Sequence, residues 1–167
     1  MNKAVFCLML SFFALSCRNS VPVPAVENFE LDKYLGVWYE VARLPNRFER
    51  GMTRVTAEYL LSDDGSIRVI NAGIKNGMTK SITGTARLQG KPGTGALEVS
   101  FFWPFYQEYR IIMLGEDYSY SVVCGSSPEY LWVLSRTTGL APEEWEKIKV
   151  FLRLHHWDPE QLLFSYE

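Results

Sequence analysis

The sequence predicts a single all-β domain: an eight-stranded antiparallel up-and-down barrel with one C-terminal α-helix and a short final strand. Eight strand-like runs follow one another at short, regular intervals, turn residues separate them, and no helical run interrupts them. The chain has 167 residues, of which 47% are hydrophobic. That length supports one domain with a substantial core, and it is too short for two.

The predicted elements begin with a helical turn over residues 31–35, directly before the first strand. The eight expected strands cover 36–43, 55–61, 67–74, 81–88, 96–103, 108–114, 120–124 and 130–136. The segments between most of them carry the Gly, Asn, Asp and Pro residues that hairpin turns require, at 63–66, 76–77, 90–93, 115–117 and 125–128.

One helix is expected after the eighth strand. Pro142 suits the first helical position, and the two glutamates after it suit the positive end of the helix dipole. Asp158-Pro159 ends the helical region, and residues 162–166 are expected to form the final strand. An apolar stripe at helical spacing predicts which face packs on the barrel: Trp145, Ile148 and Leu152.

Strand alternation predicts which side chains point into the barrel. The expected lining is mostly apolar with a few polar groups, as in pockets for hydrophobic ligands. It consists of Glu40, Ala42, Ala57, Tyr59, Val69, Asn71, Ala86, Val99, Phe101, Ile111, Met113, Val122 and Trp132. Cys124 is expected on the same inward face as Val122.

Three residues predict how one end of the barrel is closed. Gly36 and Trp38 open the first strand, and Arg136 ends the eighth, about a hundred residues later. An arginine that covers a buried indole would seal this end through a cation–π contact. A barrel sealed at one end is expected to hold a pocket that opens at the other.

The N-terminus is typical of a lipoprotein signal peptide over residues 1–16. Lys3 supplies a positive start, and residues 4–15 form an apolar run too short to span a bilayer as a stop-transfer helix. The run ends at Ala14-Leu15-Ser16-Cys17, which resembles a bacterial lipobox with Ala14 in place of the usual leucine and makes Cys17 the expected lipidation site. The alternative is an ordinary secretory signal peptide followed by a chance cysteine. Residues 17–27 are then a lipid-anchored tether, and residues 28–167 the folded domain.

Cysteine and charge counts narrow the functional classes. Once the signal peptide is removed and Cys17 is lipidated, only Cys124 remains, so no intramolecular disulfide is expected. The formal net charge of −2 gives no reason to expect nucleic-acid binding. No cofactor or metal is predicted, because His155-His156 lie adjacent in the helical region without an acidic or cysteine cluster.

The motifs resemble those of the lipocalin family in order and spacing. Residues 31–40 are similar to its first motif, Glu116-Asp117-Tyr118 to its second with Glu in place of Thr, and Ser135-Arg136 to its third. Further segments resemble bacterial outer-membrane lipocalins, namely 45–51, 99–106, 123–125 and 130–132. The resemblance covers residues 28–166.

The resemblance implies a carrier that stores or transports fatty acids or lysophospholipids in the barrel for membrane biogenesis or maintenance. It implies a place in the bacterial cell envelope, anchored to the outer membrane through lipidated Cys17, on a side that the sequence leaves open. The expected partners are a fatty acid or lysophospholipid and the membrane. A second copy of the chain, in a homodimer, stays open as a further partner.

Three alternatives remain at this point. The first is a lipocalin-fold enzyme that uses Cys124 as a nucleophile, although no cationic neighbour is visible nearby in sequence. The second is an integral outer-membrane barrel, which fits poorly with polar side chains on the outward face. The third is an interaction module whose barrel is occluded.

Three groups of residues, one inside the predicted pocket and two outside it, have open interpretations. Glu40, Tyr59 and Asn71 would hold a lipid head group or bond to one another and to water. The arginines of the first loop would meet anionic lipid or remain solvated: Arg43, Arg47, Arg50 and Arg54. The aromatic run over 101–106 would form a pocket rim, dock a partner, or pack around Pro104.

Overall fold

The structure is a computed structural model that describes residues 23–166. A short helix, α1 (Leu31–Tyr34), precedes the strands, and a longer one, α2 (Pro142–Leu154), follows them. The main strands are β1 (Gly36–Arg43), β2 (Met52–Leu61), β3 (Ile67–Lys75), β4 (Met78–Leu88), β5 (Ala96–Phe102), β6 (Phe105–Leu114), β7 (Tyr120–Cys124) and β8 (Leu131–Ser135). The short β9 (Leu163–Phe164) comes last, and two 3₁₀ turns cover Glu116–Tyr118 and Pro159–Gln161.

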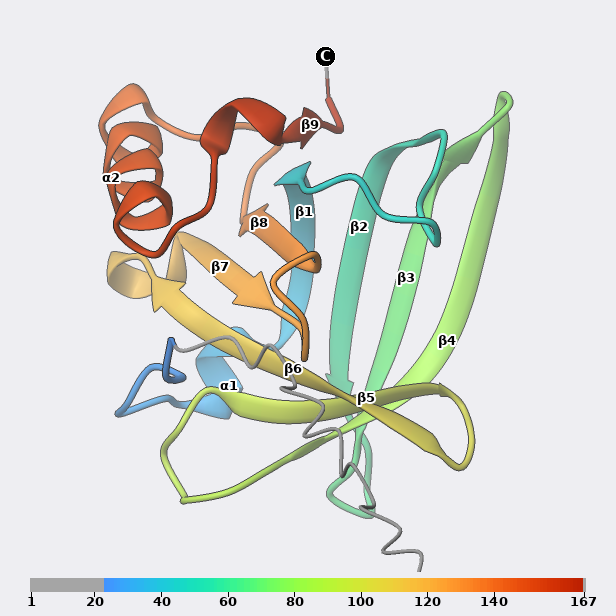
Figure 1. The fold of residues 1–167 in the computed structure, drawn as a ribbon. Helices are drawn as coiled ribbons and strands as arrows, with labels where there is room; N and C mark the ends of the chain where they lie inside the picture. Colours follow the sequence, from blue (N-terminus) through green and yellow to red (C-terminus); the bar gives the residue numbers. More distant parts are fainter. Residues whose placement is uncertain (1–22, 167) are drawn as a thin grey trace, which may run out of the picture.

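The eight main strands form the predicted closed antiparallel barrel (Figure 1). Each strand pairs with the next along the chain, and β1 pairs with both β2 and β8, which closes the sheet on itself. Trp38 lies opposite Ala57 on β2, and Glu40 lies opposite Leu134 on β8. The final strand β9 adds to the far end of β1, so the expected fold class is confirmed.

Strands β2, β4 and β6 begin three residues earlier than expected, at Met52, Met78 and Phe105. The β3–β4 hairpin is tight, because Asn76 and Gly77 both adopt positive φ, 52° and 73°, as a two-residue turn of this kind requires. The β4 residues before Thr85 have no partner on β5, so the upper part of β4 pairs only with β3.

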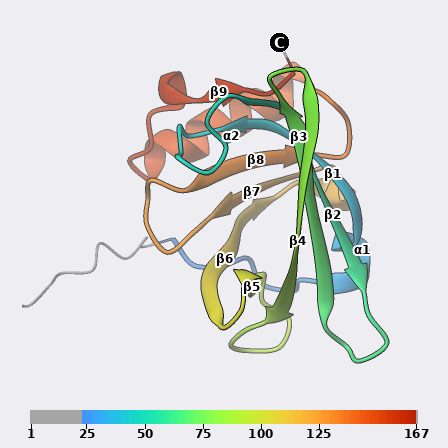
Figure 2. The ribbon, with the colours of Figure 1, turned by 90° about the vertical axis from the view of Figure 1, so that its right-hand side faces the viewer.

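Buried apolar side chains form two clusters on opposite sides of the barrel wall. The interior cluster lies inside the barrel and at its end beside α1, and contains Phe29, Tyr34, Trp38, Ala57, Tyr59, Ile67, Val69, Ala86, Leu97, Val99, Ile111, Val123 and Leu134. The outer cluster lies between α2 and the outer face of β6, β7, β8 and β1, and includes Ala42, Ile112, Val122, Cys124, Leu131, Val133, Ile148 and Leu152. Figures 1 and 2 show α2 outside the barrel wall.

The start of α2 follows from its sequence. Pro142 occupies its first turn, and the Glu144 carboxylate accepts a hydrogen bond of 3.1 Å from the Ala141 backbone N–H. Ile148 and Leu152 are fully buried against the barrel, as the apolar stripe predicts. None of the helices within residues 23–166 has the length and apolar character that crossing a bilayer takes.

The segment before α1 packs on the barrel from its first described residue. Val23 is 3% exposed and belongs to the outer cluster, and the Val26 N–H donates 2.8 Å to the Ile111 carbonyl. Residues 23–27, expected as the end of the tether, are therefore fixed to the domain. Residues 1–16 and Cys17, predicted as the signal peptide and lipidation site, lie outside the described residues. All eight barrel strands and α2 lie within residues 23–166, so a chain that begins at Arg18 retains every one of them.

Candidate ligand-binding site

The end of the barrel beside α1 is sealed by Trp38 and Arg136. Trp38 is fully buried, and its indole N–H donates a hydrogen bond of 2.8 Å to the Tyr34 carbonyl. The Arg136 guanidinium carbon lies 3.8 Å from the centroid of the Trp38 ring. A cation–π contact of a partly exposed arginine contributes on the order of 1 kcal/mol. The predicted closure geometry is thus present.

The Arg136 guanidinium also ties three parts of the chain together. It donates 2.9 Å to the Val37 carbonyl on β1 and 2.7 Å to the Lys33 carbonyl in α1, while its own backbone continues from β8. Gly36 allows the turn between α1 and β1, because its φ of +90° is strained for any residue with a side chain.

Three tyrosine hydroxyls form a polar layer next to the closed end. The Tyr34 and Tyr59 hydroxyls each lie 2.7 Å from the Tyr109 hydroxyl, and the Ser121 hydroxyl lies 3.4 Å from that of Tyr34. Burial raises the pKa of Tyr34 to about 12 and raises those of Tyr59 and Tyr109 as well, so all three phenols are neutral at physiological pH. Because the hydroxyls donate hydrogen bonds to one another, they need no ligand as a hydrogen-bond partner.

Most of the predicted lining residues face the barrel interior. Eight of them belong to the interior cluster or pack against it: Ala57, Tyr59, Val69, Ala86, Val99, Phe101, Ile111 and Trp132. Asn71 on β3 lies opposite Ala57 on β2, so both side chains are on the inward face. The buried Oδ1 of Asn71 has no hydrogen-bond partner among the described residues. Gly84 leaves room for Phe101, whose ring would lie 2.7 Å from a Cβ at that position.

Four residues expected to face inward lie in the outer cluster instead, namely Ala42, Met113, Val122 and Cys124. Bulges explain the first two. Val41 is an extra residue in β1 relative to β8, and Ile112 is an extra residue in β6 relative to β7, so alternation reverses after each. On β7 the inward side chains are Ser121 and Val123. All five β7 residues are buried, so no polar pattern marks its faces.

Cys124 is poorly suited to be a nucleophile. It is fully buried beneath α2, outside the barrel interior. Burial raises the pKa of its thiol to about 11, against the opposing effect of Arg110. Across residues 23–166, no group of three or more His, Cys, Asp or Glu side chains is placed to hold a metal ion.

A buried ionic network lies at the other end of β1. Arg43 is 3% exposed, and its guanidinium donates a hydrogen bond of 2.6 Å to the Glu40 carboxyl group and one of 2.9 Å to the Ser165 hydroxyl. It also donates 3.0 Å to the Glu49 carbonyl, while the Glu49 carboxylate accepts 3.0 Å from the Trp132 indole N–H. Arg43 is therefore neither a solvated loop residue nor an exposed lipid contact. The bulge at Val41, which no sequence signal marks, turns it toward Glu40.

The loop between β1 and β2 lies across this end of the barrel, opposite α1 (Figure 1). Besides the Glu49 contact, the Phe48 ring lies 6.0 Å from the ring of Tyr130, which stacks on Trp132 at 6.1 Å. Elsewhere on this end, inward-facing side chains are partly exposed, and Ile82, opposite Asn71, is 39% exposed. The interior is thus sealed beside α1 and in contact with solvent at the opposite end.

The fold and this geometry define a class of protein: a small antiparallel barrel, closed at one end by an arginine over a tryptophan, with an apolar lining. The Lipocalin-like domain family matches residues 29–166. The chain belongs to the lipocalin family.

Relatives and solved structures agree with this assignment. The chain is 46% identical over 138 residues to Outer membrane lipoprotein Blc of Citrobacter freundii, covering 80% of this chain and 78% of the relative. It is 45% identical over 139 residues to Outer membrane lipoprotein Blc of Vibrio cholerae serotype O1, covering 81% of each. Insecticyanin of the tobacco hornworm Manduca sexta shares the fold, with a TM-score of 0.71 at 21% identity over 86% of this chain and 83% of its own.

Membership of this family supports a carrier role for small hydrophobic molecules. The expected location, lipid-anchored at the outer membrane of a bacterial cell, is confirmed by the lipoprotein relatives, whose names state it.

Trp38→Ala removes the indole that seals the barrel. We expect it to lower the free energy of unfolding by about 3–5 kcal/mol, the usual cost of deleting a buried large aromatic side chain. Trp103→Ala is the matched control, because Trp103 is 85% exposed and should change stability by less than about 0.5 kcal/mol. Urea unfolding measures both, and equal effects would contradict the closure role.

The raised pKa of the buried Glu40 carboxyl group makes the free energy of unfolding depend on pH. Burial and then the charge of Glu49 raise its pKa from 4.5 to about 8, against the opposing effects of Ser165 and Arg43. Below pH 4.5 the folded and unfolded chains both keep this proton. Between pH 4.5 and about 8 only the folded chain keeps it, so the contribution of Glu40 to stability falls as pH rises, by at most about 1.4 kcal/mol per pH unit.

Glu40→Gln should therefore flatten the decline in unfolding free energy over this pH window. Urea unfolding at a series of pH values measures the slope, with Glu129→Gln at an exposed position as the control. A slope that Glu40→Gln leaves unchanged would show that Glu40 is ionised throughout.

Proposed function

We propose that this protein binds the acyl chain of a fatty acid or lysophospholipid inside its barrel and stores or transports it for maintenance of the outer membrane. One observation carries the proposal. At the end away from Trp38, side chains that point into the barrel are partly exposed to solvent, namely Asn71, Ile82, Phe101 and Trp132. An acyl chain inserted there would cover them.

The chemistry of the lining favours a hydrocarbon. Burying each CH₂ group contributes about 0.8 kcal/mol, so apolar walls alone hold a chain without a set of specific polar contacts. The closed end limits how far the chain reaches, because the tyrosine layer and Trp38 are already packed.

Polar groups on the inward face are suited to the head group. The unpartnered Asn71 Oδ1 would accept a hydrogen bond from a hydroxyl or ammonium group. The side chains of Glu40 and Glu49 engage Arg43, Ser165 and Trp132, and the Glu49 carboxylate matches the charge of Arg43. This arrangement favours a lysophospholipid head group, which has donors, over a bare carboxylate.

Phe101→Asp tests the acyl site. The substitution places a charge among the inward-facing apolar groups, so we expect the affinity for a fluorescent fatty acid to fall by about tenfold or more, since 1.4 kcal/mol is a factor of ten. Phe105→Asp is the matched control on the same hairpin, because Phe105 is 73% exposed and should bind as the unaltered protein does.

Fluorescence titration without membranes, followed by displacement with a lysophospholipid, measures both variants. Equal affinities for the two variants, or no binding by the unaltered protein, would contradict an acyl site in the barrel.

We propose further that residues 1–16 are removed as a signal peptide and that Cys17 carries the lipid anchor. The location of the relatives supports this assignment. Cys17→Ser should move the protein from the membrane fraction to the soluble fraction of cells, and the purified variant should keep its affinity for the fluorescent fatty acid. Retention in the membrane fraction at the level of the unaltered protein would contradict the assignment.

A further inference from the structure

The turn between β5 and β6 presents three large aromatic side chains to solvent. Phe102 is 72% exposed, Trp103 is 85% exposed and Phe105 is 73% exposed, and they form a group that we call the aromatic tip. Phe102 and Phe105 lie opposite each other as the last pair of the hairpin. So much apolar surface at one projecting turn is characteristic of a contact site rather than of a freely solvated loop.

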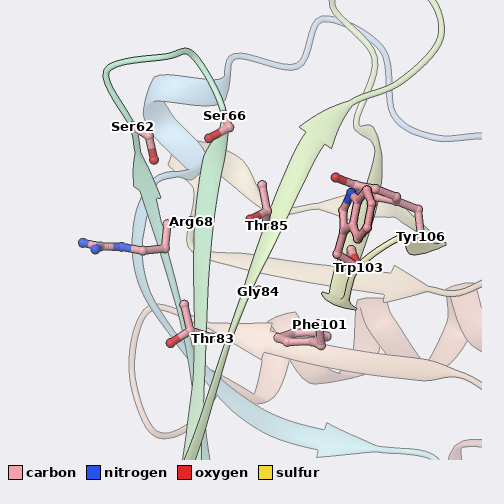
Figure 3. A pocket seen from close by; sticks show the side chains of 10 residues that line it. Ser62, Ser66, Arg68, Thr83, Gly84, Thr85, Phe101, Trp103 and Tyr106 are labelled. Atoms are coloured by element: carbon pink, nitrogen blue, oxygen red, sulfur yellow. The ribbon is translucent and has the colours of Figure 1, made fainter.

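A polar hollow of about 340 Å³ adjoins the aromatic tip (Figure 3). Trp103 and Tyr106 line it from the hairpin, and Gly84, Thr83 and Thr85 line it from β4. Most of the other lining groups are hydroxyls, with one charged side chain: Ser62, Ser66, Ser100 and Arg68. Arg68, Thr83, Thr85 and Ser100 share the outer face of the wall by their pairing, so the hollow lies outside the barrel.

Two groups of the hollow have unused hydrogen-bonding or charge capacity. Ser100 is 6% exposed, and its buried hydroxyl has no partner among the described residues. Arg68 makes no ion pair with any carboxylate in residues 23–166. Apolar rings beside a hollow lined by hydroxyls match a phospholipid surface, where hydrocarbon lies next to a polar head group.

The charges around the tip are close to balanced. Arg87 pairs with Glu98 and lies 4.4 Å from the centroid of the Tyr106 ring. Asp63 and Asp64 in the β2–β3 turn stand near Arg68 in sequence, and the Asp64 carboxylate accepts hydrogen bonds from Ser66. Without an excess of positive charge, the surface suits a largely zwitterionic membrane, and attachment would depend on ring insertion rather than on attraction to anionic lipid.

The start of the folded domain places a membrane within reach of the tip. The Arg110 guanidinium donates 3.2 Å to the Val23 carbonyl, and Arg110 is five residues along β6 from Phe105, a span of about 17 Å. Cys17 is six residues before Val23, which allows at most about 22 Å of extended chain. A lipid on Cys17 would therefore hold the barrel close to the bilayer. The side held there is the one on which β6 runs between Arg110 and the aromatic tip.

We propose that the aromatic tip inserts into the surface of a phospholipid bilayer, with the adjoining hollow against the head groups. The proposal rests on the proposed lipid-carrier function. It adds the orientation in which the barrel meets the membrane. Phe101 and Gly84, which line the hollow, also adjoin the barrel interior, so a lipid docked at the tip lies next to the acyl site.

Vesicle binding by a chain that begins at Arg18 tests the proposal, because this chain lacks Cys17 and retains every strand of the barrel; circular dichroism checks that it is folded. Sedimentation with vesicles of phosphatidylethanolamine and phosphatidylglycerol should show binding that falls by about tenfold or more in the double variant Trp103→Ser, Phe105→Ser. Leu154→Ser is the control, since Leu154 is 71% exposed on α2 and should bind as the unaltered chain does. Raising the salt concentration should leave binding nearly unchanged.

Equal binding by the double variant and the unaltered chain would overturn the proposal, as would a strong decrease on adding salt. Loss of a dimer in sedimentation velocity on changing the tip would also overturn it and assign the tip to a second copy of the chain. Fatty-acid titration without vesicles separates this proposal from the acyl site. A double variant that loses vesicle binding and keeps fatty-acid affinity supports the tip, whereas loss of both shows that the acyl site was disturbed.

Discussion

The contact between Arg136 and Trp38 is the constraint on which the rest of the structure depends. It joins the end of β8 to the start of β1, and through the Lys33 carbonyl it holds α1 against the same end of the barrel. Because β1 pairs with both β2 and β8, fixing this corner fixes where the sheet closes. The indole closes this end of the barrel and the tyrosine layer packs on it, so access to the interior is left to the opposite end.

A second constraint is that one side of the barrel is buried on both faces. Strands β6, β7, β8 and β1 are covered inside by the interior cluster and outside by α2, whereas β2, β3 and β4 have polar side chains on their outer face. The two halves therefore have different tasks. The helix-covered half gives the barrel its thickest core, and the other half, with β4 partly unpaired, borders the partly exposed end of the interior and the polar hollow.

The sequence predicted the closed barrel because hairpin turns and strand alternation are local signals, and because the closing residues Gly36, Trp38 and Arg136 stand at the ends of the first and last of these strands. Strand faces were predictable only where one side meets water. On β3 the polar Arg68 alternates with buried Ile67 and Val69, and the inward face was identified correctly. On β7 every residue is buried, and the prediction of which side chains point inward was wrong there.

Bulges account for most of the remaining differences. Single extra residues at Val41 and Ile112 reverse the faces of Ala42 and Met113, and the first of them also carries Arg43 to its hydrogen bond with Glu40. Ser165 completes that network from the other end of the chain, a tertiary contact that no local pattern contains. The aromatic run was visible in sequence, but its exposure depends on where the β5–β6 hairpin turns.

NMR with spin-labelled fatty acids tests the central claim most directly, namely that the barrel is sealed at Trp38 and takes a ligand from the opposite end. A nitroxide near the methyl end of the acyl chain should broaden the resonances of interior residues such as Val69 and Ala86. A nitroxide near the carboxyl end should broaden those of Asn71 and Trp132. Broadening that is confined to the outer surface, or the reverse order along the chain, would contradict the account.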